Sequence, residues 1–278
     1  MKIAVLSGKG GAGKTLVAVN LARVIAGATY VDLDTEEPNG SLFMKPTDVV
    51  SSNVAVTLPK WNRELCTGCK KCVDFCAFNA LAYVKSGMLI FDEICHSCGG
   101  CAMVCPEGAF TERQRIIGSV EVGHRGDTKV VSGALNMGEV SGIPIIKAAL
   151  ERVKDDADVV LDCPPGSACP VMESLKGADY CVLVAEPTIF GVDNLDMVYN
   201  LAKIFNKQVG VVLNKCVDGT NIARDYALSH GIPILGAIPW DMELGSLSSN
   251  GEIAVEKSAK YRTLFEGIRD SIVSEVAL

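Results

Sequence analysis

Ser7-Gly8-Lys9-Gly10-Gly11-Ala12-Gly13-Lys14-Thr15 follows a short apolar run at residues 2–6 and opens a segment of helical periodicity. Glycines at these positions let backbone N–H groups approach phosphate oxygens, and the following helix directs its positive end toward them. The Lys14 ammonium is expected to neutralise phosphate charge, and the Thr15 hydroxyl to bind Mg²⁺. A strand, a glycine-rich loop and a helix in this order predict a nucleoside-triphosphate site, formed by Gly8, Lys9, Gly10, Gly11, Ala12, Gly13, Lys14 and Thr15.

The rest of the chain alternates between short apolar runs and segments of helical periodicity. We expect further strands at residues 29–33, 115–122, 129–135, 157–161, 180–185, 209–213 and 234–238, and helices at 14–26 and 140–153. This alternation predicts an α/β fold, a doubly wound and mostly parallel sheet of the P-loop NTPase type with helices on both faces. Asp34, Asp162 and Asn214 each follow a predicted strand, so we expect them at the carboxyl edge of the sheet beside the glycine-rich loop.

Eight of the twelve cysteines fall into two copies of one spacing, C-x-x-C-x-x-C-x-x-x-C. They are Cys66, Cys69, Cys72 and Cys76, followed by Cys95, Cys98, Cys101 and Cys105. Two-cluster bacterial ferredoxins have this spacing, and their thiolates hold cubane iron–sulfur clusters. Tetrahedral zinc sites also use Cys-x-x-Cys pairs, but they rarely need a third and a fourth cysteine at these positions. We therefore expect two [4Fe-4S] clusters, with zinc as the weaker alternative.

In two-cluster ferredoxins the fourth cysteine of each run serves the other cluster. This resemblance implies one cluster on Cys66, Cys69, Cys72 and Cys105, and a second on Cys95, Cys98, Cys101 and Cys76. Pro106 follows the second run as in those ferredoxins, whereas Ala77 stands at the matching position of the first. We predict that residues 60–111 form a small α+β domain of the bacterial-ferredoxin type, inserted between the two parts of a P-loop ATPase domain, 1–59 and 112–278.

The composition argues against a nucleic-acid-binding protein and against a membrane-spanning one. A net charge of −7 argues against nucleic-acid binding, because such proteins present basic surfaces. No apolar run reaches the roughly 18 residues that a membrane span needs, and no signal-peptide core precedes the loop. We therefore expect a cytoplasmic protein, whose reducing surroundings keep the cysteines available as ligands.

The form Lys9-Gly10-Gly11-Ala12-Gly13-Lys14-Thr15 resembles the deviant P-loop of the MinD/ParA/nitrogenase-iron-protein group of ATPases. The likeness continues through Asp32-Leu33-Asp34, the double cysteine run, residues 138–142, Asp162-Cys163-Pro164-Pro165-Gly166 and Asn214-Lys215, the order found in members with an inserted ferredoxin domain. In that group the first lysine reaches the nucleotide of a partner subunit, which implies that Lys9 acts in trans in a dimer closed over ATP. The likeness further implies that Asp34 orients the attacking water and that Asp162 contacts Mg²⁺, directly or through water. Lys9, Lys14, Asp34 and Asp162 are thus the candidate catalytic residues.

Base recognition is expected at the ends of the last strands. Leu213-Asn214-Lys215 resembles the adenine-contacting segment of these ATPases, in which the Asn amide pairs with the base edge. A GTPase would carry N-K-x-D, whereas residue 217 is Val and Asp218 lies one position late. Pro239 also matches the adenine side of the family. These residues favour ATP over GTP.

Together these patterns predict a Mg²⁺-dependent ATPase, slow without a partner, whose nucleotide-dependent homodimer (or pseudo-dimer with a paralogue) couples closure to electron transfer with a redox partner. A first alternative is a maturation or carrier factor for a client metalloenzyme. Cys163 and Cys169 would then bind metal between subunits; otherwise both are buried structural thiols. A second alternative is a MinD-like spatial regulator, with residues 261–273 as an amphipathic membrane anchor. Glu266 and Asp270 favour instead a helix packed on the core, so we do not expect membrane binding.

Overall fold

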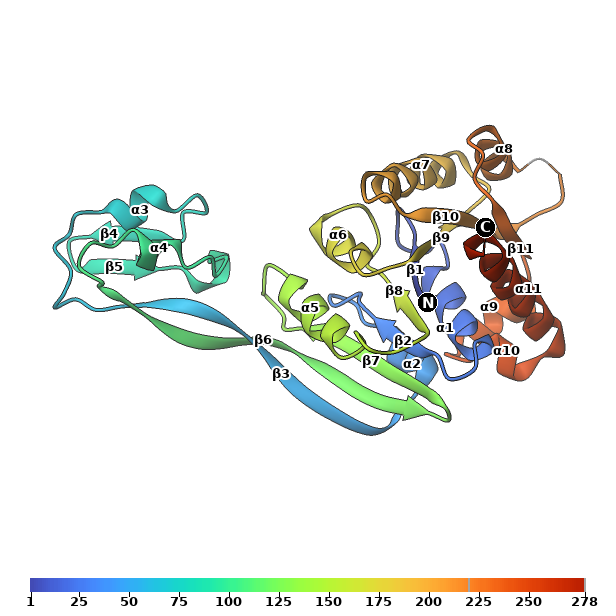
Figure 1. Cartoon of the computed structure of the whole chain (residues 1–278), viewed down its shortest axis with the longest axis horizontal. Coiled ribbons are helices and arrows are strands. Elements are labelled where there is room, and N and C mark those ends of the chain that lie inside the picture. Colours follow the sequence, from blue (N-terminus) through green and yellow to red (C-terminus); the bar gives the residue numbers. More distant parts are fainter. Residues whose placement is uncertain (220, 278) are drawn as a thin grey trace.

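The computed structural model of the chain describes residues 1–219 and 221–277 (Figure 1). Its main element is a nine-stranded sheet in the order β11-β10-β9-β1-β8-β2-β7-β6-β3. The strands of this sheet are β1 (Lys2–Leu6), β2 (Thr29–Asp32), β3 (Thr47–Trp61), β6 (Phe110–Arg125), β7 (Thr128–Leu135), β8 (Val159–Asp162), β9 (Tyr180–Ala185), β10 (Gln208–Cys216) and β11 (Ile234–Pro239). Neighbouring strands from β11 to β7 pair in parallel. Strand β6 pairs in antiparallel fashion with both of its neighbours, β7 and β3.

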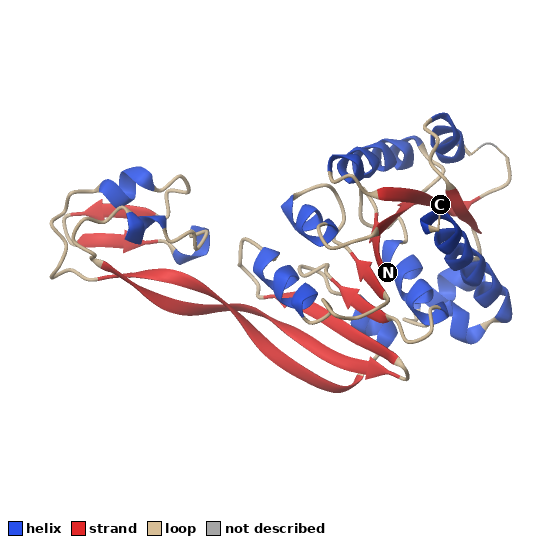
Figure 2. Cartoon of the chain, in the orientation of Figure 1, coloured by secondary structure: helices blue, strands red, loops and turns tan. Residues whose placement is uncertain are grey.

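Helices cover both faces of the parallel strands (Figure 2). One face carries α5 (Ile143–Glu151), α6 (Cys169–Leu175), α7 (Ile189–Ile204) and α8 (Ile222–Ser229). The other carries α1 (Lys14–Val24), α2 (Gly40–Met44), α9 (Met242–Ser249), α10 (Ala254–Lys257) and α11 (Ala259–Val276). Because the central strands are buried on both sides, β8 and β9 are continuous apolar runs rather than alternating ones.

Strands β3 and β6 leave the sheet together as an antiparallel ribbon, whose last pair is Trp61 with Phe110. At its far end lie residues 62–109, called here the cysteine module (Figure 1). The module contains α3 (Lys71–Phe75), β4 (Leu81–Val84), β5 (Gly87–Ile90), a 3₁₀ turn (Asp92–Ile94) and α4 (Gly100–Met103). β4 and β5 form a separate antiparallel hairpin.

The predicted α/β class and mostly parallel sheet are confirmed, but three elements, β3, β6 and α5, differ from expectation. Strand β3 was not expected: its first five residues are exposed, and Leu58 is its one buried residue among the described ones. The predicted strand at 115–122 is part of the longer β6, which pairs with β3 beyond the sheet. Helix α5 begins at Ile143 rather than at residue 140, because Pro144 favours the first turn of a helix.

Helix α11 contains the amphipathic segment 261–273. Its apolar side chains Tyr261, Phe265, Ile268 and Ile272 are all buried in the core against the sheet and α1. The structure thus uses this face for packing. In the part of the chain that the structure describes, no helix has the length and apolar character needed to cross a bilayer.

Candidate functional site

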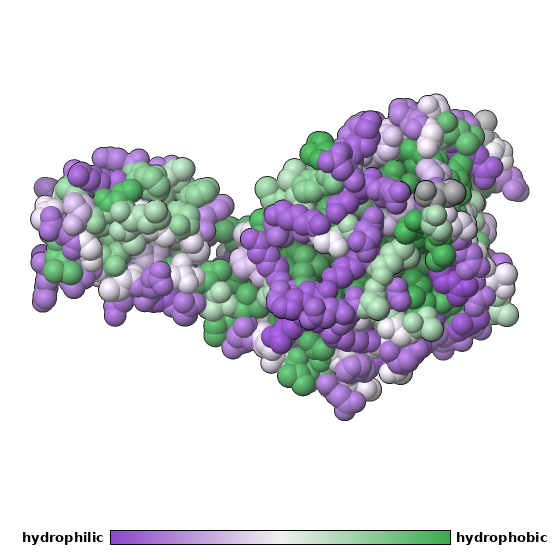
Figure 3. Space-filling view, viewed as in Figure 1, coloured by the Kyte–Doolittle hydropathy of each residue, from purple (hydrophilic) through white to green (hydrophobic). Residues whose placement is uncertain are grey.

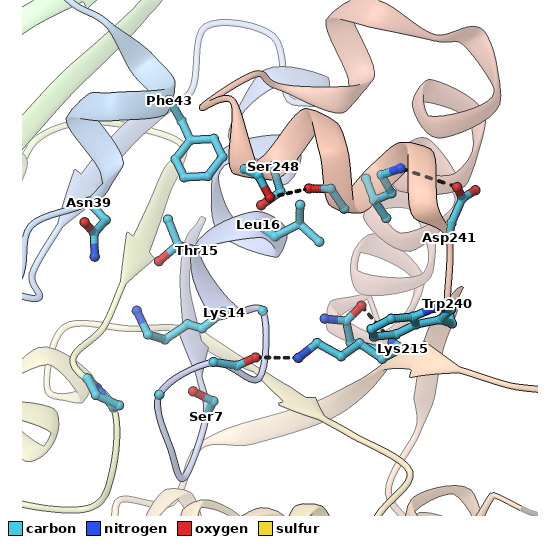
Figure 4. Close-up of a pocket in the computed structure, with 18 of the residues that line it drawn as sticks. Ser7, Lys14, Thr15, Leu16, Asn39, Phe43, Lys215, Trp240, Asp241 and Ser248 are labelled. Atoms are coloured by element: carbon cyan, nitrogen blue, oxygen red, sulfur yellow. Dashed lines mark hydrogen bonds between the residues drawn. The ribbon is translucent and has the colours of Figure 1, made fainter.

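The carboxyl edge of the parallel strands is hollowed into a cavity of about 780 Å³ beside the P-loop (Figure 4). This volume suits a bound nucleotide-sized ligand. The predicted residues that line it are Lys9, Gly10, Gly11, Gly13, Lys14, Thr15, Asp34, Asn214, Lys215 and Pro239. Gly8, Ala12 and Asp162 are not part of this lining.

Lys14 and Asp162 form a buried ion pair, with Lys14 Nζ 2.5 Å from Asp162 Oδ1. The other carboxylate oxygen of Asp162 accepts a hydrogen bond from the Tyr30 hydroxyl at 2.9 Å. Burial opposes the charge on Lys14, but the Asp162 carboxylate outweighs it and raises the pKa of Lys14 above its ordinary value. Lys14 is therefore a permanent cation at the floor of the P-loop, and Asp162 is held directly beneath it.

The loop after β2 is anchored by Asp32. Its Oδ2 accepts a hydrogen bond from the Gly40 amide at 2.7 Å, and its Oδ1 accepts one from the Asp34 amide at 3.1 Å. Burial and the neighbouring charge of Asp162 raise the pKa of Asp32 to about 8. Asp32 thus shapes the loop, while Asp34 is the carboxylate that lines the cavity.

Glu186, at the end of β9, holds two lysines of the site. Lys9 Nζ lies 2.8 Å from Glu186 Oε2, and Lys215 Nζ lies 2.5 Å from Glu186 Oε1. Burial acts to raise the pKa of Glu186, but hydrogen bonds from Lys215 and Lys9 hold that pKa below its usual value. The lysine predicted to act in trans is thus tied to a carboxylate of its own subunit.

Asn214 and Lys215, at the end of β10, donate hydrogen bonds to the P-loop, and Figure 4 labels Lys215. Asn214 Nδ2 donates to the Ala12 carbonyl at 2.8 Å, and Lys215 Nζ donates to the Gly11 carbonyl at 2.8 Å. Gly13 has a φ of +94°, and a Cβ at this position would lie 2.0 Å from Asn214 Nδ2, so glycine is required there. Because the Asn214 amide is committed to the loop, its pairing with a base stays a prediction.

The opposite end of the cavity combines apolar side chains with Asp241 and Ser248. Pro239 is followed by Trp240, whose side chain is 60% exposed, and by Met242. Leu16 and Phe43 also line the cavity (Figure 4). Lysines at the P-loop end and apolar side chains at the other end fit a ligand that carries both a phosphate and a purine base.

The eight regularly spaced cysteines line two separate cavities in the module. One, of about 10 Å³, is bordered by Cys66, Cys69, Cys72 and Cys105. The other, of about 260 Å³, is bordered by Cys76, Cys95, Cys98 and Cys101. These are the two groups of four that the crossed ferredoxin pattern implies, although ligation itself stays a prediction.

Backbone N–H groups point at the fourth sulfur of each run. The Ala80 amide donates to Cys76 Sγ at 3.4 Å, and the Ala109 amide donates to Cys105 Sγ at 3.3 Å. Among the described residues, no group of three or more His, Cys, Asp or Glu side chains is arranged to hold a single metal ion. Two sets of four soft sulfur donors with hydrogen bonds to sulfur fit a pair of clusters better than one ion in each set.

The two cysteines near Asp162 lie in different surroundings. Cys163 is fully buried in the core, where burial raises its pKa far above the usual range. Cys169 is exposed at the start of α6, so the expectation that both are buried thiols is wrong for this residue. The alternative metal site between subunits gains no support from Cys163, because its sulfur lies within the core of one subunit.

The segment after β7 links the site to the ribbon. The Leu135 amide donates to the Thr35 carbonyl at 2.8 Å, next to Asp34. The Asn136 amide donates to the Ile117 carbonyl of β6 at 2.9 Å. A Cβ at Gly142 would lie 2.0 Å from Thr35 Oγ1, so the two loops pack closely. The loop that carries Asp34 therefore contacts the base of the ribbon through residues 135–142.

These features define a P-loop nucleotide-binding protein with an α/β sheet of the doubly wound type. Residues 3–255 match the CobQ/CobB/MinD/ParA nucleotide binding domain, and the chain belongs to this family. The predicted likeness to the MinD/ParA group is thereby confirmed for the nucleotide-binding domain.

Similar sequences include two uncharacterised proteins of Methanocaldococcus jannaschii. The first is 27% identical over 281 residues and covers 98% of each chain. The second is 24% identical over 221 residues, which is 77% of this chain and 80% of the relative. A 51-residue stretch is 43% identical to indolepyruvate oxidoreductase subunit IorA of Pyrococcus horikoshii, covering 18% of this chain and 8% of that subunit.

Solved structures with the same fold include the cell division ATPase MinD of Pyrococcus furiosus. It has a TM-score of 0.60 and 18% identity, with 98% of both chains covered. The septum site-determining protein MinD of Pyrococcus horikoshii, complexed with Mg-ADP, has a TM-score of 0.60 and 17% identity, with 98% of this chain and 95% of that one covered. These likenesses establish the fold of the nucleotide-binding domain.

Two residues of the site were not anticipated from the sequence. Glu186 follows a buried apolar strand, and an acidic residue in that position is a signal for the carboxyl edge of a parallel sheet. Tyr30 lies inside the apolar run of β2, where nothing in the sequence separates a hydroxyl that binds Asp162 from an ordinary core tyrosine.

Proposed function

We propose that this protein is an ATP-binding iron–sulfur protein, an ATPase that couples nucleotide-dependent closure of two subunits to electron transfer through two [4Fe-4S] clusters. The observation that carries the proposal is the presence, in one chain, of a P-loop cavity and of two cavities each bordered by four cysteines. The P-loop cavity binds ATP for hydrolysis. Clusters held in the two cysteine-bordered cavities receive electrons and pass them on.

Hydrolysis is assigned to three residues that line the cavity and to Asp162, which pairs with one of them. Lys14 neutralises phosphate charge, the Thr15 hydroxyl and Asp162 hold Mg²⁺, and Asp34 orients the attacking water. Lys14 Nζ lies 2.5 Å from Asp162 Oδ1, and its ammonium group has two further N–H donors for a phosphate oxygen. A bound phosphate would compete with Asp162 for Lys14 and leave more of the Asp162 charge for the cation.

The cysteine module is assigned the redox role. Clusters bound there accept and donate single electrons at potentials that the surrounding hydrogen bonds tune. The Ala80 and Ala109 amides would stabilise the sulfur atoms of Cys76 and Cys105. The 51-residue likeness to an oxidoreductase subunit supports a redox role, and its length is close to that of the module.

Closure of two copies is supported by the surface around the nucleotide cavity. Exposed large apolar side chains follow the carboxyl ends of four of the parallel strands: Met137, Val140, Ile189, Phe190, Val217, Trp240 and Met242. Surfaces of this kind mark interaction sites. Lys9 lies on the same edge and is 38% exposed, so it is placed to reach a partner once Glu186 releases it.

The proposal is tested by anaerobic electron transfer from the reduced protein to a one-electron acceptor dye. The rate is measured without nucleotide, with ATP and Mg²⁺, and with a non-hydrolysable ATP analogue. We expect about eight irons per chain and a rate that depends on the nucleotide. An iron content far below eight, or one rate under all three conditions with nucleotide bound, would overturn it.

A further inference from the structure

The ribbon projects past the edge of the sheet that carries the nucleotide cavity. Strand β6 pairs with β7 along the whole of β7. The first pair is Arg125 with Thr128, and the last is Gly118 with Leu135, where β7 ends. The residues of β6 before Gly118, beginning at Phe110, continue beyond that point paired only with β3. At about 3.3 Å per residue, these eight residues extend the ribbon by roughly 26 Å. Because β7 is parallel to the central strands, this direction is that of their carboxyl ends.

The cysteine module has few neighbours in its own chain. Among the described residues, its helices and hairpin pack against one another and against the ribbon, and they make no extensive contact with the helices of the ATPase domain (Figure 1). Because the module has few neighbours, there is room beside the ribbon for another molecule. A two-stranded ribbon alone in water is marginally stable, so a contact there would also stabilise it.

The module and the ribbon both carry exposed apolar side chains. Figure 3 shows hydrophobic surface on the module and along the adjoining ribbon. In the module Met103 is 85% exposed and Leu89 is 44% exposed, and Ile116 in the ribbon is 52% exposed. Apolar surface of this extent on a small domain indicates a contact surface.

The length of the ribbon is comparable to the size of a second copy of the ATPase domain. The ATPase domain has a radius of gyration of about 17 Å and is therefore about 45 Å across. A copy that closed over the nucleotide cavity would lie against the carboxyl edge, from which the ribbon rises. A ribbon of roughly 26 Å with a module at its tip then extends along more than half of that copy.

We propose that in the nucleotide-closed dimer each ribbon and module clasps the body of the other copy. This inference rests on the dimer of the proposed function. Because the two copies are related by a two-fold axis, the contact forms twice, once on each side. Closure would cover module surface that is exposed in the single chain, and solvent exposure is one of the factors that set cluster potentials.

The test uses the intact, cluster-loaded protein with a photo-reactive benzoyl-phenylalanine in place of Ile116, Leu89 or Met103. Val273 of α11, which is 53% exposed and lies outside the module and the ribbon, is the control position. With a non-hydrolysable ATP analogue, we expect cross-links from Ile116 and from at least one module position to the ATPase domain of the other copy. Mixed heavy- and light-isotope protein identifies them as links between copies by mass spectrometry, and Val273 gives none.

Sedimentation of the same samples separates the two proposals. If the analogue produces dimers but none of the three positions cross-links between copies, the clasp is wrong and the dimer stands. If no dimer forms with the analogue bound, the closure in the proposed function is wrong, and the clasp with it. Met103→Glu should weaken the dimer by about tenfold, and Val273→Glu should leave it unchanged; equal effects would also contradict the clasp.

Discussion

Arg115 Nη2 donates to Glu139 Oε1 at 2.7 Å, and this ion pair joins the ribbon to the segment that follows β7. Both side chains are largely buried, at 22% and 11% exposure. The same segment contacts Thr35, the neighbour of Asp34, through the Leu135 amide. A change in the loop that carries Asp34 would therefore be transmitted to the base of the ribbon by a short series of contacts.

Substitutions Arg115→Gln and Glu139→Gln, alone and combined, test this connection. A charge-assisted hydrogen bond with little exposure is worth about 1.5–3 kcal/mol, so each single substitution should lower the free energy of unfolding. We also expect each to reduce the change in hydrogen exchange of residues 110–117 that an ATP analogue produces. Arg113→Gln is the matched control, because Arg113 pairs with Asp92 in the module. An undiminished response in both single variants would exclude this connection.

The buried pair of Lys14 and Asp162 gives a second prediction. Lys14→Ala leaves a carboxylate without its partner, and we expect a loss of about 3–5 kcal/mol in the free energy of unfolding. Adding Asp162→Asn should restore most of that loss, because the uncompensated charge is removed. Nucleotide binding should stay abolished in both variants. Calorimetric titration and denaturant unfolding measure the two properties; a double variant as unstable as Lys14→Ala would refute the ion-pair account.

Glu186 sets how readily Lys9 is available to a partner. Glu186→Gln should weaken the hold on Lys9 by roughly 1 kcal/mol, because the pair is partly exposed, and so tighten the analogue-dependent dimer by about fivefold. Glu151→Gln is the control, since Glu151 pairs with the exposed Lys154 at the end of α5. Sedimentation at several protein concentrations gives the dissociation constants. A weaker dimer in Glu186→Gln would show that the carboxylate supports closure rather than opposing it.

The cysteine groups predict how iron is lost when ligands are removed in pairs. Cys76 and Cys95 border the same cavity, so the double variant Cys76→Ser with Cys95→Ser should keep about four of eight irons. Cys76 and Cys72 border different cavities, so their double variant should lose nearly all. Cys169→Ser, an exposed cysteine outside the module, should keep all eight. Equal losses in the two double variants would contradict the crossed arrangement.

Much of the fold and site follows from local sequence rules. The P-loop, Asp34 and Asp162 are predictable because strand ends and glycine-rich loops have strict local signatures. The ribbon is not predictable in this way. Residues 47–58 include Val49, Val50, Val54, Val56 and Leu58, but they form a strand by pairing with residues 113–124, partners more than fifty positions away. The role of Glu186 likewise depends on Lys9 and Lys215, which only the folded sheet brings together.

The coupling between nucleotide and clusters is tested most directly by potentiometric titration of the intact, cluster-loaded chain with and without a non-hydrolysable ATP analogue and Mg²⁺. We predict that the midpoint potential of at least one cluster shifts by roughly 100 mV, which corresponds to about 2.3 kcal/mol for one electron. Lys14→Ala protein should show no shift. Superimposable titration curves for the unsubstituted protein, with the analogue verified as bound, would contradict the account.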